Sequence, residues 1–212
     1  KLAQEYANPE CIFASNTSTL PISDLAKASN NEEQFIGIHF FSPVNKMALV
    51  EIIKGKNTGD KAVAKSLDFV RQIKKTPIVV NDARYFYANR CIIPYINEGV
   101  KMVGQGISAP LIENSARQLG MPIGPLQLID ETSIDLANQI AKATKAALGQ
   151  NYVEDVSDLV LAKMVESNRL GRKSNPGFYN YDDKGKRQGF WEGLSVQWQV
   201  LVKPPSYSEI SN

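Results

Sequence analysis

The chain has 212 residues, of which 43% are hydrophobic and 22% are charged, and its 24 lysines and arginines nearly balance its 22 aspartates and glutamates. This is the composition of a globular protein, and it excludes a disordered, collagen-like or disulfide-stapled chain. A net charge of +2 gives no electrostatic reason to expect a nucleic acid or a membrane surface as partner, and no stretch approaches the ~20 apolar residues that span a bilayer.

The first part of the chain, residues 1–81, alternates strand and helix patterns, which predicts an α/β layer. Short apolar runs rich in β-branched and aromatic residues predict strands. An amphipathic stripe after Asp60 predicts a long helix that this residue caps. The predicted strands are 11–15, 35–41, 49–53 and 77–80, and a short helix is predicted at 21–28.

The second part, residues 82–182, shows helical patterns almost throughout and predicts a small all-α domain. Its helices are predicted from apolar stripes and from N-cap and glycine stop signals. The predictions are a helix with the stripe Ile92, Ile93, Ile96, Val100 and Val103, one from Ser108 to Leu119, one long helix over 126–148, and one that Ser157 caps and Gly171 ends. Residues 183–212 read as a linker, with 207–210 as the start of a following segment.

His39 is the only histidine and the first candidate for a neutral-pH general base. If strands 35–41 and 49–53 form a hairpin centred on Asn45, His39 faces Glu51, because each lies six residues from the centre. Facing residues have Cβ atoms roughly 4.5–5.5 Å apart. A carboxylate beside an imidazole can fix the tautomer of a general base, but the same pair can be a buried structural one. The hairpin alone leaves both interpretations open.

The loop Ser15-Asn16-Thr17-Ser18-Thr19 follows the first predicted strand. Four hydroxyls and an amide could form a helix N-cap cluster, the reading that composition favours. They could also line a polar pocket at the carboxyl end of a strand, where open α/β sheets bind ligands. Gly104-Gln105-Gly106-Ile107-Ser108-Ala109 matches GxGxxA, but it follows a helix pattern and is rejected as a dinucleotide fingerprint.

The two cysteines, Cys11 and Cys91, belong to no CxxC pair, so the sequence gives no support for a metal site. Both are interpreted as small buried hydrophobic residues. Reduced cysteines suit a cytoplasmic protein, and the N-terminal residues lack the apolar core of a signal peptide.

Several ordered motifs resemble the L-3-hydroxyacyl-CoA dehydrogenases, over residues 1 to about 181. The later part, Leu170 to Ser174 and Gly177 to Tyr179, resembles the alpha subunit of the multifunctional fatty-acid oxidation complex. The earlier motifs are Ser15 to Ile22, Gly37 to Val44, Leu49 to Ile53, Asn89-Arg90, Gly120 to Pro125 and Asp130.

This resemblance implies a Rossmann-like NAD-binding domain followed by a helical substrate and dimerisation domain, and oxidation of L-3-hydroxyacyl-CoA to 3-oxoacyl-CoA in β-oxidation. Matched motif by motif, the general base is His39 and its partner is Glu51. Ser18 and Asn89 contact the reacting substrate oxygen. Asn16, Ser18 and Ser42 lie near the nicotinamide of NAD. The resemblance also implies an acyl-CoA substrate, a possible homodimer and a possible thiolase partner.

Three departures from the family pattern stand out. Many relatives have Asn at the position of Ser42. Many have Asp-x-Pro-Gly-Phe where this chain reads Asp82-Ala83-Arg84-Tyr85-Phe86, which changes the backbone options of the turn. The family's N-terminal strand and GxGxxG loop have no counterpart here, so the chain is expected to be a fragment, inactive alone.

Two rival functions remain open. One is a non-catalytic helical scaffold for dimerisation or docking, and the other is a dehydrogenase of a small non-CoA hydroxy acid.

Overall fold

The computed structural model describes residues 2–174 and 176–197. The chain divides into two compact units, Lys1–Ile92 and Ile93–Asn212, which are described separately. Helix α4 (Ala88–Gly104) begins in the first unit and continues into the second. The sequence interpretation places a domain boundary earlier, at 81–82, ahead of the turn that leads into this helix.

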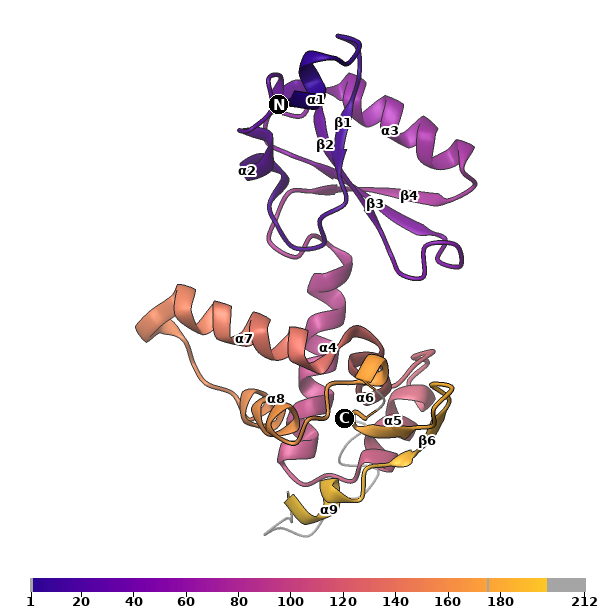
Figure 1. The fold of residues 1–212 in the computed structure, drawn as a ribbon, viewed down its shortest axis with the longest axis vertical. Helices are drawn as coiled ribbons and strands as arrows, with labels where there is room; N and C mark the ends of the chain where they lie inside the picture. The colour runs from indigo at the N-terminus through magenta and orange to yellow at the C-terminus, as the bar shows by residue number, and fades with distance from the viewer. Residues whose placement is uncertain (1, 175, 198–212) are drawn as a thin grey trace. The chain divides into compact units, whose positions relative to one another are not determined.

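The first unit contains a four-stranded sheet in the order β1-β2-β3-β4 (Figure 1). β1 runs parallel to β2, β3 runs parallel to β4, and β2 and β3 form an antiparallel pair. The bounds are β1 (Phe13–Ser15), β2 (Phe35–Phe40), β3 (Leu49–Lys54) and β4 (Thr76–Asn81). All four predicted strands are therefore present, although β1 is shorter than the predicted 11–15.

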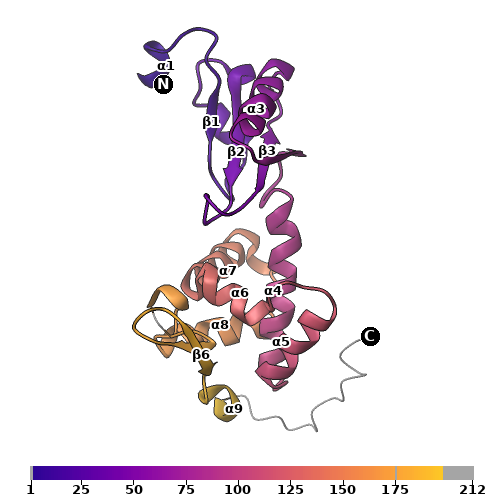
Figure 2. The ribbon, with the colours of Figure 1, turned by 90° about the vertical axis from the view of Figure 1, so that its right-hand side faces the viewer.

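Helix α3 (Asp60–Gln72) covers one face of this sheet (Figure 2). Its Ala62 and Val70 pack in one buried cluster with Ile36, Ile38, Val50 and Ile52 of β2 and β3. Because successive side chains of a strand point to opposite faces, His39 and Glu51 lie on the other face. There Ile53 packs with Ile22 and Phe86. Alternation in β2 and β3 therefore places the predicted pair away from α3.

The starts of two helices differ from their predictions. The N-cap of α3 is Gly59, and Asp60 is the first helical residue, where its charge still favours the helix N-terminus. Helix α2 (Ile22–Ala26) is not capped by the 15–19 loop, because its N-cap Pro21 makes no side-chain bond. The first unit also contains α1 (Leu2–Glu5) and the 3-10 turn η1 (Glu32–Gln34).

The carboxylate of Asp82 satisfies the N-terminus of α2 from 60 residues away in the chain. Its Oδ1 accepts from Ile22 N at 2.9 Å, and its Oδ2 accepts from Ser23 N at 2.7 Å and Ser23 Oγ at 2.6 Å. The prediction that residues 15–19 form the N-cap cluster of this helix was therefore wrong. A cap from a residue so distant in the chain leaves no signal in the local sequence.

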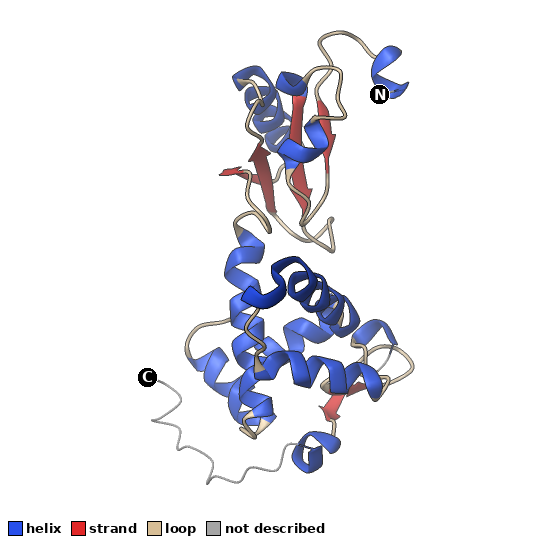
Figure 3. Cartoon of the chain, turned by 90° about the vertical axis from the view of Figure 1, so that its left-hand side faces the viewer, coloured by secondary structure: helices blue, strands red, loops and turns tan. Residues whose placement is uncertain are grey.

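Within the described residues of the second unit, the regular structure is helical except for one hairpin (Figure 3). After α4 it contains α5 (Ala109–Gln118), α6 (Pro125–Thr132), α7 (Ile134–Leu148), η2 (Gly149–Asn151), α8 (Val156–Glu166), η3 (Arg172–Ser174), β5 (Tyr179–Tyr181), β6 (Arg187–Phe190) and α9 (Gly193–Gln197). α5 follows its N-cap Ser108 and ends just before Gly120, as predicted.

Other helix predictions in this unit need correction. The single helix expected over 126–148 is two helices, because Ser133 between them adopts φ +106°. α8 is capped by Asp155, which forms a capping box with Asp158, and not by Ser157. α8 ends at Glu166, before Asn168 with φ +53°, rather than at Gly171.

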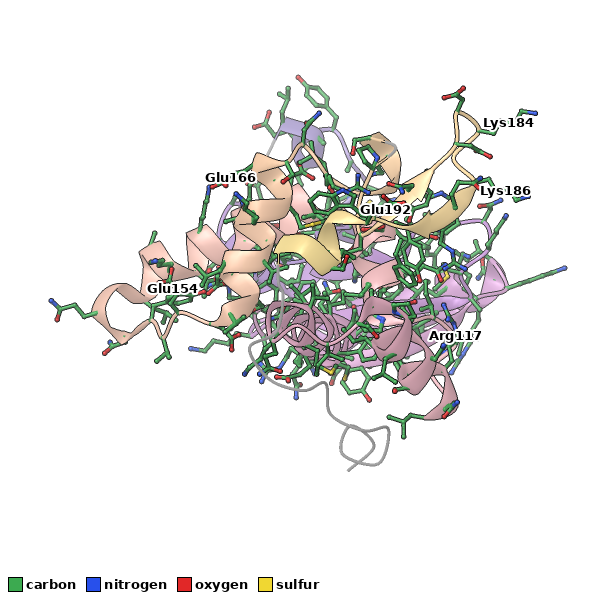
Figure 4. The ribbon with its side chains drawn as sticks, turned by 90° about the horizontal axis from the view of Figure 1, so that it is seen from below. Arg117, Glu154, Glu166, Lys184, Lys186 and Glu192 are labelled. Atoms are coloured by element: carbon green, nitrogen blue, oxygen red, sulfur yellow. The ribbon has the colours of Figure 1, made fainter. Side chains whose placement is uncertain are left out.

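The segment interpreted as a linker is in part folded. Residues 187–190 form β6, which pairs with β5, and α9 follows. Figure 4 shows Lys184 and Lys186 extending outward from the turn of this hairpin. The segment predicted at 207–210 lies outside the described residues.

Two buried carboxylates fasten the start of the hairpin to the helices. Asp130 Oδ1 accepts from Phe178 N at 2.8 Å, and its Oδ2 accepts from Tyr179 N at 2.9 Å. Glu113 accepts from the Tyr179 hydroxyl at 3.0 Å and, through Oε1, from Leu126 N at 2.8 Å. These bonds satisfy both charges inside the unit.

Candidate active site

His39 and Glu51 form a buried pair on adjacent antiparallel strands. The register pairs them directly, which confirms the predicted hairpin register. His39 Nδ1 lies 2.7 Å from Glu51 Oε2, and the two residues are 6% and 0% exposed. With the carboxylate as acceptor, Nδ1 carries the hydrogen of this bond, which leaves Nε2 as the nitrogen that can take up a proton.

The second oxygen of Glu51 is held by backbone groups. Oε1 accepts from Tyr87 N at 3.0 Å and from Ala88 N at 2.8 Å, at the start of α4. Burial works to raise the pKa of Glu51, but the hydrogen bonds from His39, Ala88 and Tyr87 outweigh it and lower the pKa. Glu51 is therefore an ionised acceptor at neutral pH, suited to orient an imidazole.

Two aromatic rings flank the imidazole of His39. The Phe41 ring centroid lies 4.5 Å away and the Phe86 centroid 6.1 Å away, both in tilted arrangements. Phe86 is itself 1% exposed. A carboxylate bonded to an imidazole and apolar rings beside it favour one rotamer and one tautomer of the imidazole. A general acid–base catalyst requires a ring oriented in this way.

The structure also brings Ser18 and Asn89 together. Asn89 Nδ2 donates to the carbonyl oxygen of Ser18 at 2.9 Å. An amide carries two donor hydrogens, so this bond leaves the second one for another acceptor. The pair is linked to Glu51 through the chain, because Ala88, which donates to Glu51, immediately precedes Asn89.

The three residues predicted to lie near the nicotinamide come just after the ends of the parallel strands β1 and β2. Asn16 and Ser18 follow β1, Ser42 follows β2, and all three are exposed. Asn16 Oδ1 accepts from Phe40 N at 2.9 Å, so this side chain ties the β1 loop to the end of β2. Polar residues beyond the carboxyl ends of parallel strands lie where α/β sheets bind ligands.

The sequence interpretation did not identify the groups that support this site. They are the backbone N–H groups of Tyr87 and Ala88 and the buried ring of Phe86. The only sequence signal was the unusual turn 82–86, where Tyr stands in place of the family's Gly. Among the described residues, no group of three or more His, Cys, Asp or Glu side chains could hold a metal ion.

Comparison with protein families gives two matches that together run from residue 1 to residue 181. Residues 1–83 match the NAD binding domain of 3-hydroxyacyl-CoA dehydrogenase, and residues 86–181 match its C-terminal domain. They confirm the predicted fold class, an α/β Rossmann-like part followed by a helical domain, and they support NAD as the family's cofactor.

Three solved structures are similar to this chain. The (S)-3-hydroxybutyryl-CoA dehydrogenase of Ralstonia eutropha is 33% identical with a TM-score of 0.78, and the match covers 86% of this chain and 65% of that one. FadB2 of M. tuberculosis is 30% identical with a TM-score of 0.74, over 83% of this chain and 62% of that one. The 3-hydroxybutyryl-CoA dehydrogenase of Escherichia coli is 28% identical with a TM-score of 0.74, over 84% of this chain and 38% of that one. The chain thus spans less than two thirds of each.

Proposed function

The chain belongs to the 3-hydroxyacyl-CoA dehydrogenase family, and we propose that it carries the catalytic residues of an NAD-dependent enzyme that oxidises L-3-hydroxyacyl-CoA to 3-oxoacyl-CoA. The observation that carries the proposal is the His39–Glu51 pair, a buried imidazole with a 2.7 Å bond to a carboxylate. It rests also on two relatives that are 3-hydroxybutyryl-CoA dehydrogenases by name.

In this proposal His39 is the general base of the oxidation and the general acid of the reverse reaction. Glu51 accepts from Nδ1, so Nε2 takes the proton of the substrate hydroxyl as its oxygen becomes a carbonyl. The charge of Glu51 stabilises the imidazolium that forms. Acid–base catalysis of this kind contributes about 100- to 10,000-fold in rate.

Ser18 and Asn89 are proposed to hold the reacting oxygen. The second amide hydrogen of Asn89 and the Ser18 hydroxyl are hydrogen-bond donors. Ser18 is exposed and Asn89 is half-buried, which leaves both donors accessible to a substrate. Donors placed at an oxygen that gains carbonyl character orient the substrate for reaction. Their bond to one another keeps the two donor residues adjacent.

The residues present fit the nicotinamide end of NAD. Asn16, Ser18 and Ser42 are exposed polar side chains beyond the carboxyl ends of β1 and β2, and they are proposed to contact the cofactor there. NAD, when bound, supplies the acceptor for the hydride that leaves C3 of the substrate.

The wider setting is also a proposal. We place the reaction in fatty-acid β-oxidation in the cytoplasm, in an assembly that includes a second copy of the chain and a thiolase. The interpretation of both cysteines as buried residues was wrong, because Cys11 is half-buried and Cys91 is exposed. Both are free thiols, the state expected of a reducing compartment. No helix of the described residues is long and apolar enough to cross a membrane.

The test follows NADH consumption with acetoacetyl-CoA by the intact protein that contains residues 1–212. We expect turnover in the parent, a loss of about 100-fold or more in His39→Gln, and no change in Lys184→Gln, whose side chain extends into solvent (Figure 4). Near-parental turnover in folded His39→Gln would contradict the role of the histidine. A folded, NADH-binding parent with no turnover would favour a scaffold, and turnover of free acetoacetate alone would favour a non-CoA substrate.

A further inference from the structure

The orientation of Glu51 depends on a turn that lies more than thirty residues after it in the chain. Its Oε2 is bonded to His39, and its Oε1 accepts only backbone hydrogen bonds, from Tyr87 N and Ala88 N. Glu51 has no exposed surface. A rotation of this carboxylate would break the bonds at both oxygens, so the position of the turn determines where Oε2 lies.

The turn has an unusual backbone. Tyr85 and Phe86 adopt φ +70° and +51°, in the left-handed region that favours glycine. Two successive non-glycine residues persist there only when their surroundings hold them. Phe86 N also donates to Ala83 O at 3.0 Å, which closes the turn on itself.

Phe86 is the residue of the turn that is held most firmly. Its ring is 1% exposed and packs with Ile22 and Ile53 on the same face of the sheet as Glu51. The ring also lies beside the His39 imidazole, with 6.1 Å between centroids. Tyr85 differs, because it is only half-buried and its ring lies under the Arg84 guanidinium, 5.2 Å away.

We propose that Phe86 is a positioning residue of the His39–Glu51 pair, whose buried ring fixes the turn so that the N–H groups of Tyr87 and Ala88 hold Glu51 Oε1. It acts through Glu51 and not on substrate. The importance of this role for catalysis rests on the proposed function, but the effect on His39 does not.

The test uses the tautomer of His39, which is read from the ¹⁵N shifts of the imidazole. His39 is the only histidine, so the signal is unambiguous in the full chain. The spectrum is recorded over a range of pH, and the tautomer is read on the alkaline plateau, where the shifts no longer change with pH. The parent is expected to hold the hydrogen on Nδ1, because Glu51 accepts it there.

Four variants separate positioning from general core packing. Phe86→Ala should reduce the Nδ1–H population, Phe86→Leu should restore most of it, and Tyr85→Gly should leave it unchanged. Ala88→Pro covers the case in which Phe86→Ala does not fold. It removes one N–H to Glu51 at the first position of α4, where proline is tolerated, and it should also reduce the Nδ1–H population.

Folded Phe86→Ala or Ala88→Pro with the parental tautomer would overturn the proposal. In the intact enzyme, the same variants should lower kcat by about ten- to a hundredfold with KM little changed, as a displaced catalytic group does. If the intact parent has no dehydrogenase activity, the proposed function fails while the tautomer still decides whether Phe86 positions the pair.

Discussion

Nδ1 of His39 and Oε2 of Glu51 lie 2.7 Å apart across β2 and β3, and both side chains are buried. The pair combines the imidazole of His39 with the carboxylate of Glu51, which has no exposed surface. The charge is tolerated because each Glu51 oxygen has a donor. Replacing either member therefore affects both folding and the proposed chemistry.

Glu51→Gln should lower activity and stability together. A glutamine cannot place an acceptor on both sides, so its NH₂ group must face either His39 Nδ1 or the Tyr87 and Ala88 N–H groups. We expect kcat of the intact protein to fall about 100-fold or more and the free energy of unfolding to fall by about 1–3 kcal/mol. NADH consumption and urea unfolding measure the two effects.

The matched control is Glu98→Gln, an exposed glutamate on α4, which should change neither quantity. Half-parental activity in Glu51→Gln would remove the proposed role of the carboxylate.

Asp82→Ala should destabilise the face of the sheet on which the site lies. The substitution removes the acceptor for Ile22 N, Ser23 N and the Ser23 hydroxyl. Loss of a helix cap costs typically about 1 kcal/mol. Hydrogen exchange of the α2 amides should therefore accelerate roughly fivefold, since 1.4 kcal/mol is a factor of ten.

Asp24→Ala is the control for this prediction, because Asp24 lies on the same helix in an exposed ion pair with Lys27. Such pairs contribute about 0–1 kcal/mol, so the exchange rates should change less. Equal effects of the two substitutions would show that Asp82 does not act as a cap.

The sequence was most informative where contacts are local. The His39–Glu51 pairing followed from a hairpin centred on Asn45, because strand alternation and a turn signal determine the register of adjacent strands. The order of an α/β part and a helical part likewise followed from periodicity, and the family matches confirm it.

Contacts between distant residues could not be predicted in this way. Asp82 caps a helix 60 residues earlier, and the amides that hold Glu51 belong to a turn 36 and 37 residues later. Strand β6 has Phe190 as its only apolar side chain and shows no alternating apolar pattern. Its segment was therefore interpreted as a linker, and its pairing with β5 was not predicted. In each case the contact depends on the tertiary structure and not on a local pattern.

Asp130→Asn should destabilise the second unit. Asp130 is 1% exposed and accepts from Phe178 N, Tyr179 N and the Tyr181 hydroxyl. An asparagine of the same shape would direct its NH₂ group at one of these donors, and an unsatisfied buried polar group costs about 1–3 kcal/mol. Urea unfolding followed by tryptophan fluorescence reports on this unit, because Trp191 follows β6 and its ring centroid lies 4.6 Å from Cζ of Arg169.

The control for this substitution is Asp183→Asn, an exposed residue in the hairpin turn, which should leave the urea midpoint unchanged. A parental midpoint in Asp130→Asn would show that the hairpin does not depend on these three bonds.

The same carboxylate should make the stability of this unit depend on pH. Burial raises the pKa of Asp130 to about 6, although the bonds from Tyr179, Phe178 and Tyr181 and the charge of Arg169 oppose the shift. An unfolded aspartate has a pKa of ~3.9. Between these values the folded unit binds more protons than the unfolded chain, so its stability rises as the pH falls. From pH 7 to pH 5 the expected gain is roughly 1 kcal/mol.

Asp130→Asn removes this titration, so the variant should show a smaller gain than the parent between pH 7 and pH 5. Comparing the parent with the variant cancels the contributions of the other titratable groups, and Asp183→Asn should follow the parent. The measurement is the urea midpoint from tryptophan fluorescence at the two pH values. Equal pH dependence in the parent and Asp130→Asn would mean that Asp130 is already ionised throughout this range, with its three donors and Arg169 outweighing its burial.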